Sequence, residues 1–441
     1  MDPLTIGLVA LVILFVLLIL SIPIGVAMAA CGVLGVAAII GLKPALALFG
    51  NTVYETTANF DLSIIPLFVL MGSVASRSGL SRELYSAFNA WLGALRGGVA
   101  LATVGACGAF AAICGSSVAT AATMSQVALP EMKRFKYSDS LATGSVAAGG
   151  IIGILIPPSV VLVLYGILTE TSIGDLFIAG FIPGILTTLG FMLVIAIFTR
   201  FNPQAGPKGE KTTVGEKFKA LGRTWAILLL FILVIGGIYF GFFTPTEAAG
   251  IGAVGAFGIA AMRGRLNFET IKGSLLETIR TTGMIFTILI GAIALNNLMV
   301  FSGMAYGLSS FVSGLDMHPM MVMVIILIIY LILGCFMDAL AMILLTVPIF
   351  FPIVVNLGFD PVWFGIIVVM VVELGLITPP IGMNVFVIKG MAQNVPLQTI
   401  YKGVIPFVAA QIVLVILVFL FPQIALWLPD TADAIQDWLN L

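Results

Sequence analysis

The apolar segments of this chain constrain its fold more than any other feature. A helix of roughly 20 apolar residues spans the hydrocarbon core of a bilayer. Segments of about that length lie at 5–24, 26–41, 62–76, 175–199, 225–243, 246–262, 282–301 and 403–428. Charged residues make up only 9% of the 441 residues, whereas a soluble fold carries about a quarter. So few polar groups cannot cover a surface in water, so the sequence predicts an all-α integral membrane protein with the lipid bilayer as its solvent.

The same composition excludes several classes of function. The net charge of −1 gives no general attraction to polyanions, so nucleic acid is not an expected partner. The chain has one histidine, His318, and its four cysteines show neither pairing nor C-x-x-C spacing. Zinc, haem and triad chemistry are therefore not expected. We predict no enzyme activity, no catalytic residues and no covalent cofactor.

Two apolar regions are interrupted by a short polar tip. The region at about 97–130 is interrupted at Gly115-Ser116, and the region at about 320–355 is interrupted just before Asp338. Each half of such a region is short for a full crossing of the membrane. The pattern predicts two re-entrant hairpins, each made of two short helices.

Two long apolar regions each contain a pair of prolines. Pro157-Pro158 divides the region at about 138–168, and Pro379-Pro380 divides the one at about 362–391. Proline lacks an N–H group and clashes with the preceding turn, so each pair leaves carbonyls unpaired. Unsatisfied backbone is tolerated at membrane depth only where it is buried in protein or lines a wet cavity. We therefore predict two helices broken at an internal site.

The proline positions repeat along the chain. Shifting the sequence by 222 residues aligns Pro23 with Pro245, Pro130 with Pro352, Pro157 with Pro379, Pro158 with Pro380 and Pro207 with Pro429. Chance predicts about 0.5 such matches for 21 prolines, and similarity at a fixed shift indicates a repeat. The sequence thus predicts two related units at 1–200 and 223–441, joined by a linker at 201–222.

Basic residues fix the expected orientation, because cytoplasmic loops carry an excess of Lys and Arg. With the N-terminus outside, every Lys and Arg except Lys43 falls on the cytoplasmic side, including those of the linker, and the C-terminus lies outside. On this path the first hairpin opens to the cytoplasm and the second to the exterior. The units are therefore predicted to be inverted-topology repeats, an architecture in which transporters bind ions and substrate between broken helices.

No Lys or Arg lies within a predicted span, so an acidic ligand would depend on helix N-termini, hydroxyls, amides and bound cations. Each unit offers one cluster of such groups. The first comprises Gly115, Ser116, Ser117, Thr120, Gly149, Gly150, Gly153, Pro157, Pro158 and Ser159; the second comprises Asp338, Gly375, Thr378, Pro379, Pro380, Gly382 and Asn384. Close packing of helices through small residues is the alternative explanation of the glycines and serines.

Three further polar residues stand in apolar surroundings. An intramembrane acid is a functional hypothesis by default, and Asp338, at a hairpin tip, is the better candidate for an ion ligand. Glu373 is either a proton site or a residue buried against hydroxyls and amides, and the sequence does not decide between them. Asn296 could contact substrate, although a hydrogen bond between helices explains it more simply.

Several motifs together resemble a known family. The chain reads GSSVATAAT at 115–123, PEM at 130–132, GILIPPS at 153–159, TSIGDLF at 171–177, PLFVLMG at 66–72, FMD at 336–338 and TPP at 378–380. Over essentially its whole length the sequence resembles the large membrane subunit of tripartite ATP-independent periplasmic (TRAP) transporters. The resemblance implies a bacterial or archaeal inner-membrane secondary transporter with an elevator mechanism, driven by a sodium gradient.

The resemblance also implies partners, substrates and site residues. The partners are a small four-helix membrane subunit, here a separate polypeptide, and a periplasmic substrate-binding protein. The substrate is a small organic acid such as a dicarboxylate or a sialic acid, and Na⁺ is the coupling ion. One sodium site falls at Ser116, Ser117, Gly153 and Pro157, and the other at Asp338, Gly375, Thr378 and Pro379. Candidate substrate-binding residues are Gly115, Thr120, Ser159, Gly382, Asn384 and Asn296.

Two other functions compete with this interpretation. A single-component organic-anion transporter of the same superfamily would share the architecture, and it would transport without partner proteins. An anion channel could share broken helices, but it does not need two cation clusters or a sodium gradient.

Overall fold

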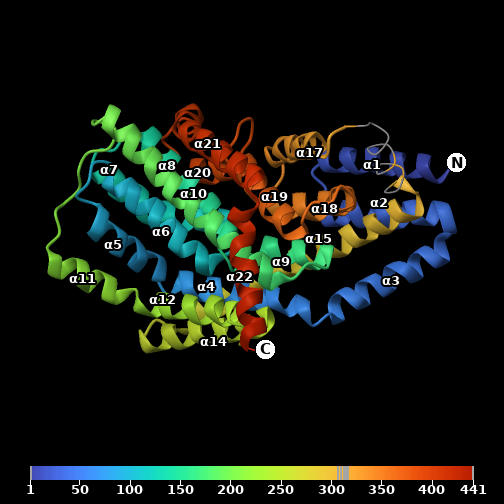
Figure 1. Cartoon of the computed structure of the whole chain (residues 1–441), viewed down its shortest axis with the longest axis horizontal. Coiled ribbons are helices and arrows are strands. Elements are labelled where there is room, and N and C mark those ends of the chain that lie inside the picture. Colours follow the sequence, from blue (N-terminus) through green and yellow to red (C-terminus); the bar gives the residue numbers. More distant parts are fainter. Residues whose placement is uncertain (1, 305–306, 308–309, 311–316, 440–441) are drawn as a thin grey trace.

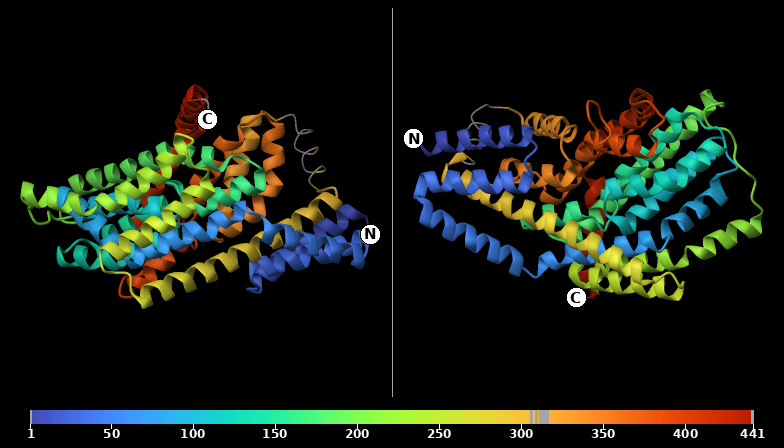
Figure 2. Two further views of the ribbon diagram at one scale, coloured as in Figure 1. Left: turned by 90° about the horizontal axis from the view of Figure 1, so that it is seen from below. Right: turned by 180° about the vertical axis from the view of Figure 1, so that it is seen from behind.

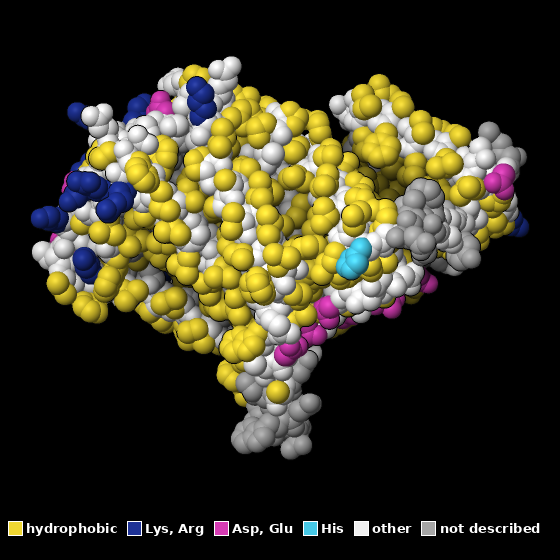
Figure 3. All heavy atoms as spheres, turned by 45° about the horizontal axis from the view of Figure 1, so that its top comes forward, with side chains coloured by type: hydrophobic (Ala, Val, Ile, Leu, Met, Phe, Trp, Pro, Cys, Tyr) yellow, Lys and Arg dark blue, Asp and Glu magenta, His cyan; other side chains and the backbone are white. Residues whose placement is uncertain are grey.

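The structure, a computed structural model, describes residues 2–304, 307, 310 and 317–439. All regular secondary structure in these residues is helical, so the predicted all-α class is confirmed. Five of the described helices are long and apolar enough to cross a membrane, and up to seven are if each of two bent helix pairs counts as one span. Large apolar side chains cover most of the molecular surface in Figure 3, as a lipid-facing surface requires.

The first part of the chain ends in a hairpin, a broken helix and one long span (Figure 1). Its helices are α1 (Pro3–Ile19), α2 (Ile24–Ile40), α3 (Leu42–Ala58), η1 (Asp61–Ser63), α4 (Ile64–Arg77), α5 (Leu80–Leu92), α6 (Gly98–Cys114), α7 (Ser117–Arg134), α8 (Asp139–Leu155), α9 (Val160–Thr169) and α10 (Ile173–Phe201). Helices α6 and α7 form the first hairpin, and α8 and α9 are the two parts of the first broken helix.

The second part contains another hairpin and another broken helix in the same order (Figure 1). Its helices are α11 (Val214–Arg223), α12 (Trp225–Phe231), η2 (Ile232–Gly236), α13 (Gly237–Tyr239), α14 (Pro245–Met262), α15 (Phe268–Phe301), α17 (Pro319–Gly334), α18 (Ala339–Asn356), α19 (Pro361–Gly375), α20 (Met383–Met391), α21 (Leu397–Leu420) and α22 (Gln423–Leu439). The peptide bonds Pro157-Pro158 and Pro379-Pro380, between α8 and α9 and between α19 and α20, are both cis.

The structure corrects two expected spans and adds a helix that the apolar segments did not indicate. The apolar segment 403–428 is not one helix, because α21 ends at Leu420, Phe421 before Pro422 leaves the helical conformation, and a second helix, α22, follows. That helix projects from the body of the molecule (Figure 2). The segment 282–301 is only the end of α15, whose 34 residues begin with polar turns that a search for apolar segments passes over. Residues 42–58, which carry few consecutive apolar side chains, form α3.

The two broken helices form the centre of the molecule. Every residue of α8 from Leu141 to Leu155 is buried, and so is every residue of α19 from Trp363 to Gly375. Close approach is possible because the contact points are glycines: a Cβ added at Gly144 would lie 2.3 Å from the carbonyl oxygen of Gly403 in α21. In lipid, helix association depends on such packing, since apolar groups gain little by leaving apolar solvent.

The first and second parts also pack against each other away from this centre. Helices α2 and α15 run side by side (Figure 1), and Gly32 of α2 lies directly against the backbone of Ala294 in α15. Helix α14 packs against α4, and α10 against α21 and α22. The helices α1–α4, α14 and α15 thus form a framework beside the hairpins and broken helices.

Charged side chains are separated along the molecule. In Figure 3, Lys and Arg gather at one end, and several Asp and Glu lie along the opposite edge. Segments distant in sequence meet at the basic end: Arg134 pairs with Glu210 at 2.7 Å, and Arg263 and Arg265 both pair with Glu83. One end of the fold therefore collects the loops predicted to be cytoplasmic.

The linker at 201–222 is part of this end rather than a free, solvated tether. The N–H of Gly97 donates to the carbonyl of Gly206 at 2.9 Å, and the Tyr137 hydroxyl donates to the carbonyl of Pro207 at 2.8 Å. The last part of the predicted linker is helical, since α11 begins at Val214 after a capping box formed by Thr213 and Glu216.

Separate Glu170→Cys and Lys211→Cys substitutions in a variant lacking the native cysteines test the orientation. Both side chains are exposed, Glu170 in the turn between α9 and α10 and Lys211 in the linker. By the positive-inside rule, we expect a membrane-impermeant thiol reagent added to intact cells to label only Glu170→Cys. Lys211→Cys should react only after permeabilisation, and its labelling from outside would contradict the orientation.

Candidate functional site

The first hairpin turns at two residues with distinct backbone roles. Gly115 ends α6 in the left-handed region (φ +62°), and a Cβ there would also lie 2.6 Å from the carbonyl oxygen of Pro158. Ser116 begins α7, and its hydroxyl accepts a hydrogen bond from the Ala119 N–H at 3.3 Å. The tip of the hairpin therefore lies directly against the Pro-Pro break between α8 and α9.

Gly153 of α8 brings the first cluster together. A Cβ added at Gly153 would lie 2.8 Å from both the Ser116 carbonyl oxygen and the Thr120 hydroxyl oxygen. Thr120 is fully buried, and its hydroxyl has no hydrogen-bond partner. Buried polar atoms normally have partners, so this unpaired oxygen beside a carbonyl is a candidate position for a ligand. Ser159, also buried, begins α9 and accepts from the Leu162 N–H at 3.3 Å.

The second hairpin meets the second break in a similar way. The Asp338 carboxylate accepts hydrogen bonds from the N–H groups of Leu340 and Ala341 at 3.0 and 3.1 Å, so it caps the first turn of α18. Just before it, the Cys335 carbonyl accepts from the Gly382 N–H at 3.2 Å. The tip of the second hairpin is thereby joined to the turn between α19 and α20.

Two other predicted residues line this second break. A Cβ at Gly375 would lie 2.6 Å from the Gly334 carbonyl carbon, so only glycine allows α17 and α19 to approach this closely. The Thr378 hydroxyl donates to the Leu374 carbonyl at 2.6 Å, which leaves its oxygen lone pairs available. Thr378 directly precedes the Pro379-Pro380 pair, whose peptide bond is cis.

One hydrogen bond connects the two clusters. The Ser117 hydroxyl, in the first turn of α7, lies 2.7 and 2.8 Å from the two carboxylate oxygens of Glu373 in α19. Both residues are 1% exposed. Glu373 is therefore buried against a hydroxyl, an arrangement that both alternatives for this residue allow. Sequence reasoning placed the two residues in different units and gave no signal that they pair.

Asn384 and Asn296 occupy different surroundings. Asn384 is fully buried in α20 with both side-chain polar atoms unpaired, and its amide nitrogen is the second nearest atom to a Cβ built at Gly150, at 3.1 Å. It therefore lies at the junction of the two clusters. Asn296 is half-buried in α15, next to residues that pack on α2, and no described contact connects it to the clusters.

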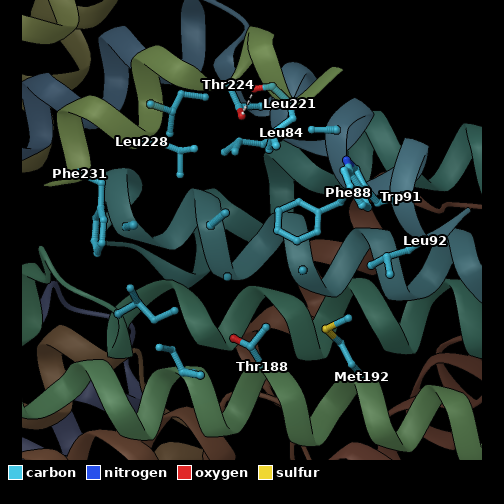
Figure 4. Close-up of a pocket in the computed structure, with 18 of the residues that line it drawn as sticks. Leu84, Phe88, Trp91, Leu92, Thr188, Met192, Leu221, Thr224, Leu228 and Phe231 are labelled. Carbon is cyan, nitrogen blue, oxygen red and sulfur yellow. Dashed lines mark hydrogen bonds between the residues drawn. The ribbon is translucent and has the colours of Figure 1, made fainter. Parts of the chain in front are cut away.

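A polar cavity of about 1110 Å³ leads from the basic end to one face of α7. Thr123 and Gln126 of α7 line it opposite Arg77 and Glu277, which pair at 3.0 Å. An apolar crevice of about 590 Å³ lies between α5, α6, α10 and α12, with Trp91, Phe88 and Phe231 in its wall (Figure 4). Of these two, the polar cavity is the one that suits an acid or a hydrated ion.

An all-helical membrane protein with two hairpins, two broken helices and buried polar groups where these meet has the architecture of a secondary transporter. The comparison with known families defines it further: the family described as "Tripartite ATP-independent periplasmic transporter, DctM component" matches residues 11–424. The chain belongs to this family of TRAP transporter large permeases. It is therefore a transport protein and not an enzyme, and a multi-pass protein of the inner membrane.

Individual relatives agree with this assignment. The C4-dicarboxylate TRAP transporter large permease protein DctM of Pseudomonas aeruginosa is 38% identical over 86% of this chain and 88% of its own. The sialic acid TRAP transporter large permease protein SiaM of Vibrio cholerae is 32% identical over 84% and 87%. The crystal structure of the Alcanivorax borkumensis YdaH transporter shares the fold, with a TM-score of 0.64, 16% identity and coverage of 86% of this chain and 88% of that one.

The close contact at Gly153 generates a test of the first cluster. We expect Gly153→Ala to lower the free energy of unfolding by about 1–3 kcal/mol, because its methyl group must displace the Ser116 carbonyl or the Thr120 hydroxyl. Gly250→Ala in α14 is the control, since nothing lies within 4 Å of its added Cβ. Thermal denaturation in detergent measures both, and equal midpoints for the two variants would contradict the contact.

Proposed function

We propose that this chain imports a small organic acid across the inner membrane by sodium symport, with an elevator mechanism. A periplasmic substrate-binding protein delivers the acid, and a small four-helix membrane subunit completes the permease. Membership of the TRAP large permease family supports the transport role and both partners. The names of the relatives support a carboxylate substrate such as a C4-dicarboxylate or a sialic acid.

The observation that carries the proposal is the meeting of each hairpin tip with a Pro-Pro break. Helices α7, α9, α18 and α20 all begin at these places, so their free N–H groups and partial positive charges gather around the clusters. The helices that end at these places, α6, α8, α17 and α19, contribute carbonyl groups that have no partner in the next helical turn. N–H groups suit the carboxylate of an acid, and carbonyl and hydroxyl oxygens suit Na⁺.

We assign the first sodium ion to the first cluster. Ser116, Ser117, Gly153 and Pro157 remain the proposed ligands, and the unpaired Thr120 hydroxyl beside the Ser116 carbonyl supports this position. The second ion is assigned to Asp338, Gly375, Thr378 and Pro379. The free lone pairs of Thr378 and the proximity of the tip at Cys335 to Gly382 support it.

The acid itself is placed between the two ions. Asn384, with both polar atoms unpaired and fully buried, is the leading candidate, together with Gly115, Thr120, Ser159 and Gly382. Asn296 lies apart from these residues in α15 and is the weakest member of the substrate-binding set.

In the proposed elevator motion, the hairpins and broken helices move together against the framework of α1–α4, α14 and α15. The Ser117–Glu373 hydrogen bond and the contact of Gly150 with Asn384 favour movement of α7, α8, α19 and α20 as one body. Both termini lie outside in this proposal, and the basic end faces the cytoplasm.

Sodium dependence tests the two ion assignments. We expect Asp338→Asn and Ser116→Ala each to raise the sodium concentration for half-maximal uptake by about tenfold, since each change weakens or removes an oxygen ligand. Because ion and substrate binding are coupled reciprocally, the apparent affinity for the acid should fall as well. Uptake in proteoliposomes at varied sodium and constant ionic strength measures this, and an unchanged requirement in both variants would refute the sites.

Reconstitution tests the partners. We expect this chain alone in liposomes to give no saturable uptake of free dicarboxylate or sialic acid under a sodium gradient. Addition of the small subunit and the cognate binding protein should restore it, because the acidic edge and the absence of a basic anchor in the spans leave capture to a partner. Saturable uptake by the chain alone would favour the single-component alternative.

A further inference from the structure

We propose that Glu373, which lies in the second part of the chain, is a positioning residue for the sodium ion bound in the first cluster. It acts through the Ser117 hydroxyl. This inference rests on the proposed function, since it concerns how the first sodium site is held. Glu373 is outside both predicted ligand sets, and it contacts the first cluster only because the fold brings α19 against the start of α7.

The geometry of the hydroxyl allows both roles at once. A serine oxygen has one proton to donate and two lone pairs to offer. The Ser117 proton points to a carboxylate whose two oxygens lie at nearly equal distances, 2.7 and 2.8 Å. The hydroxyl can therefore not turn its proton toward a cation, and its lone pairs remain directed away from Glu373. Groups that fix the orientation of a metal ligand in this way also raise its basicity.

An ionised Glu373 needs a positive charge nearby, and the sodium ion of the first cluster can supply it. The ion pairs of the described residues join Arg77, Arg134, Arg263 and Arg265 to other acids, and none of them includes Glu373. A buried carboxylate with one hydroxyl partner is costly unless a cation lies close by or a proton neutralises it. A sodium ion ligated by Ser117 supplies that positive charge, because the Ser117 side chain contacts both the ion and Glu373.

The neighbouring packing holds the pair in place. Glu373 lies within the fully buried run of α19, and Gln411 of α21 donates from its side-chain amide to the Met370 carbonyl at 3.4 Å, about one turn away. Ser117 is held by the cap of α7, where the Ser116 side chain accepts from the backbone. Neither residue can turn toward water, so the contact between the two clusters is constant within this conformation.

Sodium binding, measured without transport, tests this inference. Thermal stabilisation of the detergent-solubilised complex with its small subunit is recorded against NaCl, with choline chloride keeping the ionic strength constant. We expect Glu373→Ala to raise the half-saturating sodium concentration 10–100-fold. Glu373→Gln should shift it less, because the amide oxygen still accepts the Ser117 proton. If the alanine variant does not fold, the glutamine variant is tested instead, with at least a threefold shift expected because a neutral amide oxygen accepts the Ser117 proton more weakly than a carboxylate does.

The double variant distinguishes positioning from separate effects. Ser117→Ala combined with Glu373→Ala should shift sodium binding no more than Ser117→Ala alone, because Glu373 acts through that hydroxyl. The matched control is Gln411→Leu, which removes another buried hydrogen bond to α19 and should leave the sodium requirement unchanged. An equal shift in the control, or shifts that multiply in the double variant, would overturn the inference.

These outcomes separate the inference from the proposed function. If the unsubstituted complex shows no stabilisation specific to sodium, sodium symport itself fails. If it binds sodium and Glu373→Ala and Glu373→Gln bind it equally well, only the role of Glu373 fails.

Discussion

The structure depends on one constraint: a peptide group without a partner is very costly at membrane depth, so backbone can be non-helical only where the protein itself surrounds it. The four interruptions in this chain, two hairpin tips and two Pro-Pro breaks, solve this by meeting in pairs. Gly115 lies on the carbonyl of Pro158, and the Gly382 N–H donates to the carbonyl of Cys335. Side chains complete the pairing, since Ser116, Ser159 and Asp338 each cap the helix that they begin. Non-helical backbone, which the bilayer excludes elsewhere, is thus concentrated in two places, each formed by one hairpin tip and one Pro-Pro break.

This concentration requires a particular kind of core. Hydrophobic side chains gain little by packing in lipid, so the central helices rely on close backbone contact. A Cβ added at Gly144, Gly153 or Gly375 would overlap a backbone atom of a neighbouring segment, and at Gly153 it would also overlap the Thr120 hydroxyl oxygen. Gly153 and Gly375, which the sequence offered as either site residues or packing residues, are therefore packing residues whose close approach brings the polar groups together.

Local features could be predicted from the sequence, and contacts between distant segments could not. Proline pairs and polar tips act on the backbone next to them, so the end of the first hairpin helix at Cys114 and the breaks at the two proline pairs followed from composition and spacing. Pro422 was missed because a search for apolar segments treats proline as neutral. The pairing of Ser117 with Glu373 spans 256 positions, and no periodicity or motif encodes it. Asn384 was proposed as a site residue, but that both its polar atoms would be buried unpaired required the packing of α20 against α7 and α8.

The distribution of charge completes the argument. Most Arg and Lys side chains in Figure 3 gather at one end, and none of the described hydrogen bonds of the clusters involves a basic side chain, while Glu373 and Asp338 lie within the clusters. An anion entering this centre would meet carboxylates of its own sign. Bound cations reverse that sign, so in the proposed mechanism the sodium ions supply the positive charge that other anion sites take from arginine. Acid and sodium then bind strongly only together, and reciprocal coupling of this kind is what links the movement of one to the gradient of the other.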